Sequence, residues 1–192
     1  EKPLHSINEK EAKDSFATLD YLIRIAGEIN ITDIVIPCVD QSSLVDNHSL
    51  KRFVDRVRKI VPLIESSDVN LSLETDLAPL PFNELLSQFD SKNITVNYDI
   101  GNSAALGFDP IEELTLYGNK ISDIHIKDRI LSGGPVVLGE GDANFSGFFN
   151  KVKDLNYEGP FIMQAYRDDE GLEVYKKQLA WIKPYLENLW SR

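Results

Sequence analysis

Short apolar runs typical of β-strands alternate along this chain with segments whose apolar residues recur at helical spacing. The strand-like runs lie near residues 32–38, 70–75, 94–99, 121–126 and 160–165. Regular alternation of strand and helix is typical of a parallel sheet with crossover helices on its faces. The sequence therefore predicts an α/β fold, either an open doubly wound sheet or a (β/α)8 barrel. Neither GxGxxG nor GxxxxGKS/T follows the first strand, which disfavours the nucleotide-binding form of the open sheet.

Sequence signals also predict the helices and their ends. Apolar residues at helical spacing cover residues 9–28, 49–65, 81–89, 110–118, 145–155 and 171–190. Asn30 is a candidate left-handed stop for the first helix, and Asp109 followed by Pro110 is typical of an N-cap with proline at the first helical position. Pro62 and Pro184 fall inside helical patterns, so we expect a kink or break at Pro62 and a bend at Pro184.

Composition narrows the class of function. The chain has 31 Asp and Glu residues against 20 Lys and Arg, a formal net charge of −11, which argues against nucleic acid or an anionic membrane as its main partner. The single cysteine, Cys38, excludes an intramolecular disulfide and fits a reducing compartment. No apolar run approaches the roughly 18 residues of a spanning helix, and the N-terminus lacks a signal-peptide pattern. We therefore predict one cytoplasmic domain over residues 1–192.

Four predicted strands end, at or near their C-terminal side, in a residue that can bind a metal ion. These residues are Glu74 in LSLETD, Asp99 in NYDIGN, His125 in DIHIKDR and Gln164 in FIMQAYR. The C-terminal ends of parallel strands converge at one edge of the sheet, where α/β folds carry their active sites. Two carboxylates, an imidazole and an amide oxygen suit Mn²⁺, Mg²⁺ or Co²⁺, and the lack of a thiolate argues against a structural zinc site.

Each of the four residues also has a purely structural interpretation. A single carboxylate after a strand is often a helix cap or turn residue, and His125 between two isoleucines could be a core histidine. Gln164 could be a hydrogen-bonding residue at the mouth of a barrel. The coincidence of four ligand-type groups at one end of the fold favours the metal site over four separate structural roles.

Positive charge lies next to this set in the sequence. Lys127 and Arg129 follow His125, Arg167 follows Gln164, and the glycine-containing segments 132–134 and 139–141 come between the strands. Glycine amides together with basic side chains make a candidate anion site. The alternative is that Lys127 pairs with Asp123 or Asp128 and that the glycines only turn the chain.

The segments LSLETD, VNYDIGNSAALGFDP, ISDIHIKDR, LGEGDANF and GPFIMQAYR resemble the xylose-isomerase-like (β/α)8 sugar and sugar-phosphate isomerases and epimerases. The resemblance extends from about residue 12 onward and implies a TIM barrel. Such a barrel usually takes about 250 residues. Residues 34–38 match the family's fourth strand, so we expect an incomplete barrel of five parallel βα units. Either the chain is a fragment of a longer product or the missing strands come from elsewhere.

In the family, a Glu, an Asp, a His and a second Glu bind one divalent metal ion. The resemblance carries these roles to Glu74, Asp99, His125 and Gln164, with Mn²⁺, Mg²⁺, Co²⁺ or Zn²⁺ as the ion. Two positions depart from the pattern: Gln164 replaces the second Glu, and Asn102 replaces the substrate histidine of Asp-x-x-His. A glutamine can ligate through its oxygen but cannot accept a proton, which favours a mechanism with one base.

The resemblance implies a metal-dependent isomerase or epimerase of a small sugar or sugar phosphate, acting by proton transfer through a metal-stabilised enediolate. Glu74 would be the base, and the substrate-binding residues would be Asn102, Lys127, Arg129, Glu140 and Arg167. One alternative is a dehydratase or lyase on the same metal site, with Glu140 as a candidate acid. Another is a non-catalytic sugar-binding protein. Nucleic acid and membrane are not expected partners, and a homo-oligomer stays open.

Overall fold

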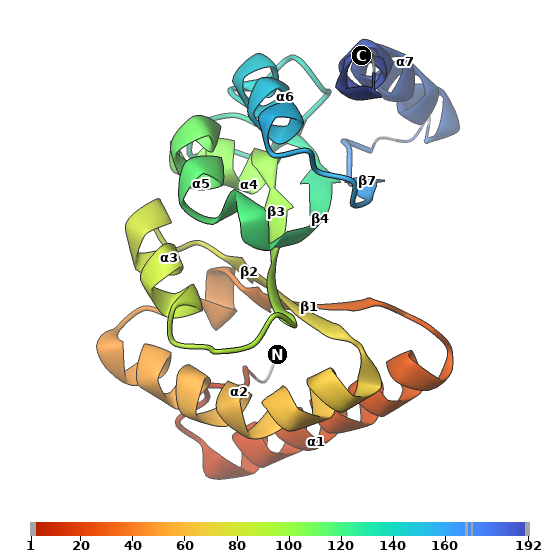
Figure 1. Ribbon diagram of the computed structural model, residues 1–192. Coiled ribbons are helices and arrows are strands. Elements are labelled where there is room, and N and C mark those ends of the chain that lie inside the picture. The colour runs from red at the N-terminus through yellow and green to blue at the C-terminus, as the bar shows by residue number, and fades with distance from the viewer. Residues whose placement is uncertain (1–2, 168, 170, 191–192) are drawn as a thin grey trace. The chain divides into compact units, whose positions relative to one another are not determined.

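All five predicted strands form in the computed structural model, which describes residues 3–167, 169 and 171–190. They are β1 (Asp33–Cys38), β2 (Asn70–Thr75), β3 (Ile94–Asp99), β4 (Ile121–Ile126) and β7 (Phe161–Met163). The chain divides within β3 into two compact units, one up to Asn97 and one from Tyr98 onward. Each unit is described by itself (Figure 1).

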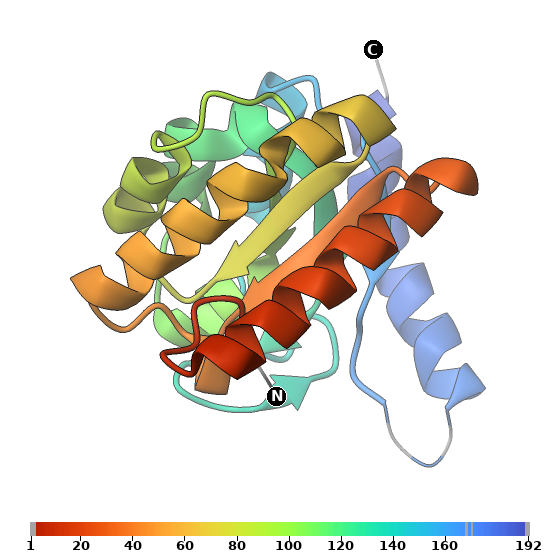
Figure 2. The ribbon, with the colours of Figure 1, turned by 90° about the horizontal axis from the view of Figure 1, so that it is seen from below.

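The first unit is a parallel sheet covered by helices. β1 runs parallel to β2 with Ile34 opposite Leu71, and β2 runs parallel to β3 with Leu73 opposite Val96. The helices of this unit are α1 (Glu9–Glu28), α2 (Asn47–Ser67) and α3 (Pro79–Leu86). Figure 2 shows α1 and α2 side by side over β1 and β2. The parallel register therefore brings the C-terminal ends of these strands to one edge, as predicted.

Local sequence explains the limits of α1. The side chain of Asn8 accepts hydrogen bonds from the backbone N–H groups of Lys10 and Glu11, which satisfies donors that have no partner inside the helix. The helix ends at Glu28, and Asn30 has a φ of 57°. The left-handed stop predicted at Asn30 is confirmed.

The expected break at Pro62 is wrong, because α2 continues through this residue to Ser67. Pro62 is exposed, whereas Ile60 and Ile64 on either side of it are fully buried. The buried face thus packs without interruption, and water can bond to the carbonyl group that proline leaves without a helical partner. Likewise, α7 (Leu172–Trp190) continues through Pro184.

The second unit contains β4 and β7, which are parallel with Ile124 opposite Phe161. Its remaining helices are α4 (Ile100–Leu106), α5 (Pro110–Tyr117) and α6 (Phe145–Asp154). Aromatic side chains of α6 and α7 pack together: the ring centres of Phe145 and Trp181 lie 5.0 Å apart, and those of Phe149 and Tyr185 lie 5.1 Å apart. These ring contacts join α6 to α7.

Two short features were not predicted from the sequence. Helix α4 has only seven residues and follows β3 directly, and β5 (Asp128–Arg129) pairs antiparallel with β6 (Pro135–Val136) in a hairpin after β4. Both are too short to show a periodic pattern. Within the described part of the chain, no helix combines the length and the apolar content needed to cross a membrane.

Candidate functional site

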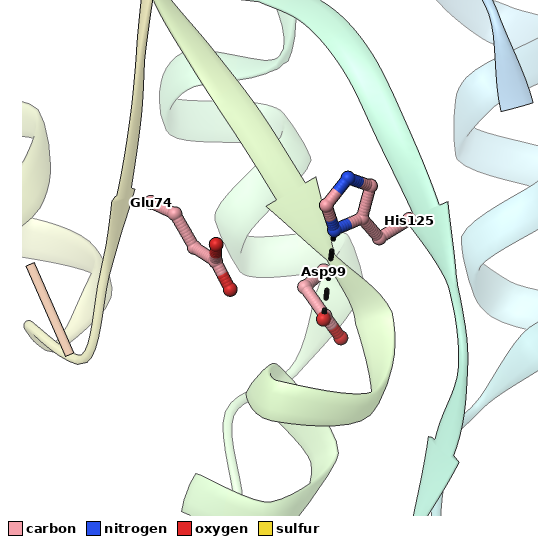
Figure 3. Close-up of side chains that lie close together, drawn as sticks. All are labelled: Glu74, Asp99 and His125. Carbon is pink, nitrogen blue, oxygen red and sulfur yellow. Dashed lines mark ion pairs between the residues drawn. The ribbon is translucent and has the colours of Figure 1, made fainter. Parts of the chain in front are cut away.

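Asp99 ends β3 and divides its two carboxylate oxygens between the fold and the site. Oδ1 accepts a hydrogen bond from the backbone N–H of Asn102 at 2.8 Å and so caps α4. Oδ2 lies 3.3 Å from Nζ of Lys127. It also lies 3.9 Å from Nδ1 of His125, as Figure 3 shows. The side chain is 1% exposed. The cap and the lysine thus hold a buried carboxylate in one orientation.

The His125 ring lies between two carboxylates of its own unit. Its Nδ1 faces Asp99, and its Nε2 lies 3.8 Å from Oδ1 of Asp123. Both distances exceed those of hydrogen bonds. A histidine that binds a metal ion through one nitrogen commonly has a carboxylate near the other. Asp123 is in position for that second role.

The ammonium group of Lys127 donates hydrogen bonds to three polar side chains of the second unit. Its Nζ donates to Oδ2 of Asp99 at 3.3 Å, to Oδ1 of Asn102 at 3.3 Å and to Oε1 of Gln164 at 3.0 Å. The alternative pairing of Lys127 with Asp123 or Asp128 is therefore wrong. Three residues predicted for the site thus contact the ammonium group of a fourth, Lys127.

Arg129 reaches the same cluster from β5. Its Nη1 donates to Oδ1 of Asn102 at 2.8 Å, and its Nε and Nη2 donate to the carbonyl oxygen of Gly133 at 3.1 and 2.8 Å. The neutral Asn102 oxygen thus accepts from two cations, Lys127 and Arg129. Two positively charged groups thus lie beside Asn102.

The loop with Gly139 and Gly141 is held by Asp128, a fully buried residue. Oδ2 of Asp128 accepts hydrogen bonds from the backbone N–H groups of Gly139 and Gly141, both at 2.9 Å, and Oδ1 accepts from Ala143 at 3.2 Å. These amides bind an internal carboxylate, so the expectation that they hold an external anion is wrong. Glu140 is exposed in the same loop.

Gln164 directly follows β7 and is anchored by its backbone, whose N–H donates to the carbonyl oxygen of Ile126 at 3.0 Å. Together with Lys127 and the exposed Arg167, it lines an open cavity of about 660 Å³. The remaining lining residues are Pro135, Met163, Ala165 and Tyr166. The structure therefore brings three predicted residues to one cavity within the second unit.

Glu74 lies near the C-terminal end of β2, in the first unit, and is half-buried (Figure 3). β1 is its neighbour, with Cys38 opposite Thr75. Burial, followed by the charges of Asp76 and Glu74, raises the pKa of the Cys38 thiol to about 12. Cys38 is thus a neutral packing residue at neutral pH.

Sequence reasoning missed a buried hydrogen-bond network beneath α4. Glu113 of α5 accepts hydrogen bonds from the hydroxyl groups of Tyr98 and Tyr117, both at 2.8 Å, and from Ser103. Burial raises the pKa of Glu113 despite these three hydrogen bonds, which lower it. Tyr98 precedes Asp99, so the network fixes the strand end that carries the site. Nothing in the sequence distinguishes Glu113 from the exposed Glu112 beside it.

Residues 2–185 match a family model described as "Xylose isomerase-like TIM barrel". Among similar proteins, "Putative L-ribulose-5-phosphate 3-epimerase SgbU" of Haemophilus influenzae is 30% identical over 202 residues. That alignment covers 96% of this chain and 70% of the other protein.

Two solved structures share the fold. A D-tagatose 3-epimerase-like protein has a TM-score of 0.79 at 23% identity, over 97% of this chain and 74% of its own. The IolI protein with a bound zinc atom has a TM-score of 0.76 at 17% identity, over 97% and 73%. The predicted α/β fold of the xylose-isomerase-like type is confirmed, with the barrel incomplete over these residues.

Proposed function

Because the chain belongs to the xylose isomerase-like TIM barrel family, we propose that it is a divalent-metal-dependent isomerase or epimerase of a sugar or sugar phosphate. The observation that carries the proposal is the pair formed by Asp99 and His125, whose oxygen and nitrogen face each other at 3.9 Å at adjacent predicted strand ends. The name of the SgbU relative supports epimerase activity on a ketose phosphate.

The donor atoms fit a divalent ion. Oδ2 of Asp99 and Nδ1 of His125 are an anionic oxygen and an imidazole nitrogen, the donors that Mn²⁺, Co²⁺ and Zn²⁺ accept. We propose Glu74 as the third ligand, because LSLETD resembles the segment that carries the family's first metal-binding glutamate. The bound zinc of the IolI neighbour agrees with such a site. The ion, when bound, would supply positive charge to the substrate oxygens.

The residues of the chain divide the remaining work. Glu74 would take the proton from the carbon next to the substrate carbonyl group, since neither Asn102 nor Gln164 can accept one. The two oxygens of Asp99 bind the backbone N–H of Asn102 and the ammonium group of Lys127. Asp99 would therefore hold its neighbours in position and would not transfer protons. A single base favours transfer of the proton between two neighbouring carbons on one face of the substrate.

The basic residues favour a phosphorylated substrate. Lys127 and Arg129 meet on the neutral oxygen of Asn102, and Arg167 lines the cavity that Lys127 enters. This concentration of positive charge stands out in a chain with a net charge of −11. Ammonium and guanidinium groups are the usual ligands of phosphate oxygens.

The direct test is incubation of the purified protein with ketopentose 5-phosphates in D₂O, with and without Mn²⁺, followed by NMR. We expect Mn²⁺-dependent incorporation of deuterium beside the carbonyl carbon, together with an isomer of the substrate. Glu74→Gln should reduce the rate about 10²–10⁴-fold. The matched control Glu84→Gln, at an exposed position of α3, should not change the rate.

If the wild type binds Mn²⁺ and a sugar phosphate but catalyses no exchange, the non-catalytic sugar-binding alternative holds. Full activity in Glu74→Gln would contradict the assignment of the base. Release of water from the substrate, seen as a deoxy product, would instead identify a dehydratase.

A further inference from the structure

We propose that Gln164 is a positioning residue for Lys127 and not a metal ligand, and that Lys127, so held, binds the anionic group of the substrate. This inference rests on the proposed function, which supplies the metal ion and the substrate class. It departs from the expectation that Gln164 completes a four-residue metal site.

The hydrogen bond between the two side chains fixes the orientation of the Gln164 amide. A lysine ammonium has three N–H donors and no acceptor, so the atom of Gln164 that it meets at 3.0 Å must be the carbonyl oxygen. The amide NH₂ group then faces away from Lys127. The one atom of Gln164 that could ligate a metal ion is therefore already bonded to a cation.

Gln164 and Asp99 both contact Lys127, but they differ in charge. The carboxylate of Asp99 carries a full negative charge and can serve an ammonium group and a metal ion together. The Gln164 oxygen is neutral, so sharing it would place a divalent ion and an ammonium group close together with no charge between them. Repulsion thus disfavours metal ligation by Gln164 while Lys127 stays in place.

The three acceptors of Lys127 come from separate segments: Asp99 from β3, Asn102 from α4 and Gln164 after β7. They match its three N–H donors, so the ammonium group attracts an anion through its charge and not through an unused N–H. The side chain is 18% exposed, so it is held in place and still reaches solvent. Its exposed side lines the cavity of about 660 Å³ with Arg167. An anionic oxygen entering this cavity meets a fixed ammonium group and a guanidinium group.

The test is calorimetric titration of the metal-free protein with MnCl₂ and, separately, with inorganic phosphate. Gln164→Met keeps the side-chain volume and removes the oxygen. We expect it to leave Mn²⁺ affinity within about threefold, whereas His125→Ala should lower it by about 100-fold or more. Lys127→Met should raise Mn²⁺ affinity about tenfold, since it removes the neighbouring positive charge.

Phosphate binding tests the second half of the proposal. Lys127→Met should weaken it about tenfold or more, and Gln164→Met by a smaller factor, because the ammonium group loses one anchor. Lys177→Met, on the exposed face of α7, is the matched control and should bind phosphate as the wild type does. Thermal melting of each variant checks that it is folded.

The outcomes separate the inference from the proposed function. Tenfold weaker Mn²⁺ binding by Gln164→Met would make Gln164 a metal ligand and overturn the inference alone. Unchanged phosphate binding by Lys127→Met would also overturn it. A folded wild type that binds no Mn²⁺ would overturn the proposed function, and the phosphate titrations would still decide whether Gln164 and Lys127 act together.

Discussion

Replacement of Asp128 by alanine should release the loop that contains Gly139 and Gly141 while leaving the rest of the second unit folded. Asp128 is fully buried, and its carboxylate accepts three backbone N–H groups. A hydrogen bond to a charged group contributes about 1.5–3 kcal/mol net, so three of them set an upper limit of about 9 kcal/mol. The measured cost will be smaller, because the amides of an exposed loop can turn to water.

A loss of about 3 kcal/mol follows if the loop opens and water replaces most of these bonds. Amide hydrogen exchange followed by NMR gives the local value at Gly139 and Gly141, and urea unfolding gives the global one. Local opening predicts much faster exchange at these two amides, with protection retained at Ile124 of the buried strand β4. Asp154→Ala, at an exposed helix end, is the matched control.

Asp128→Asn refines the test. One of its side-chain atoms becomes an NH₂ group, which faces backbone donors and cannot accept from them. It should cost less than alanine, because the remaining oxygen can still accept from Gly139 and Gly141. Unchanged exchange at both glycines in Asp128→Ala would refute the view that this carboxylate organises the loop.

Three further outcomes follow from the described contacts. Burial raises the pKa of Glu113, so its contribution to stability is present at low pH and is lost as the pH rises above its ordinary value of 4.5. The urea midpoint of the wild type should therefore fall between pH 5 and pH 8, and that of Glu113→Gln should fall less. An equal dependence of the midpoint on pH in the two proteins would contradict this. Phe148→Ala should cost about 3–5 kcal/mol in urea unfolding, because the ring is fully buried and stacks on Tyr98 at 5.5 Å; a loss under 1 kcal/mol would show that the core repacks. Asp99→Asn should keep the cap on α4 but lower Mn²⁺ affinity at least tenfold, and unchanged metal titrations would remove Asp99 from the site.

The strands could be predicted because they contain short runs rich in apolar residues between polar segments, β-branched at 34–36 and alternating with polar residues at 69–73. The N-cap predicted at Asp109 is confirmed, because its side chain accepts a hydrogen bond from the backbone N–H of Ile111. The break expected at Pro62, as the alternative to a kink, does not occur, and the sequence alone could not show that this proline lies on the exposed face of the helix.

The partners of the charged side chains could not be predicted. Lys127 and Asp128 are neighbours in the sequence, yet one bonds to Asp99, 28 residues earlier, and the other to a loop that ends at Ala143. Successive residues of an extended segment point to opposite sides, so adjacent charges meet different surroundings. Only tertiary structure decides which acceptor each one finds.

The two oxygens of Asp99 restrict how this position can change over evolutionary time. Asparagine keeps the cap on α4 but loses the negative charge, and glutamate keeps the charge but is one methylene too long for the same cap. A single substitution at this position therefore either keeps the cap on α4 and weakens binding of the metal ion, or keeps the charge that binds the ion and loses the cap. Variation toward new substrates should then accumulate at Asn102, Gln164 and Arg167, whose side chains shape the site without capping a helix.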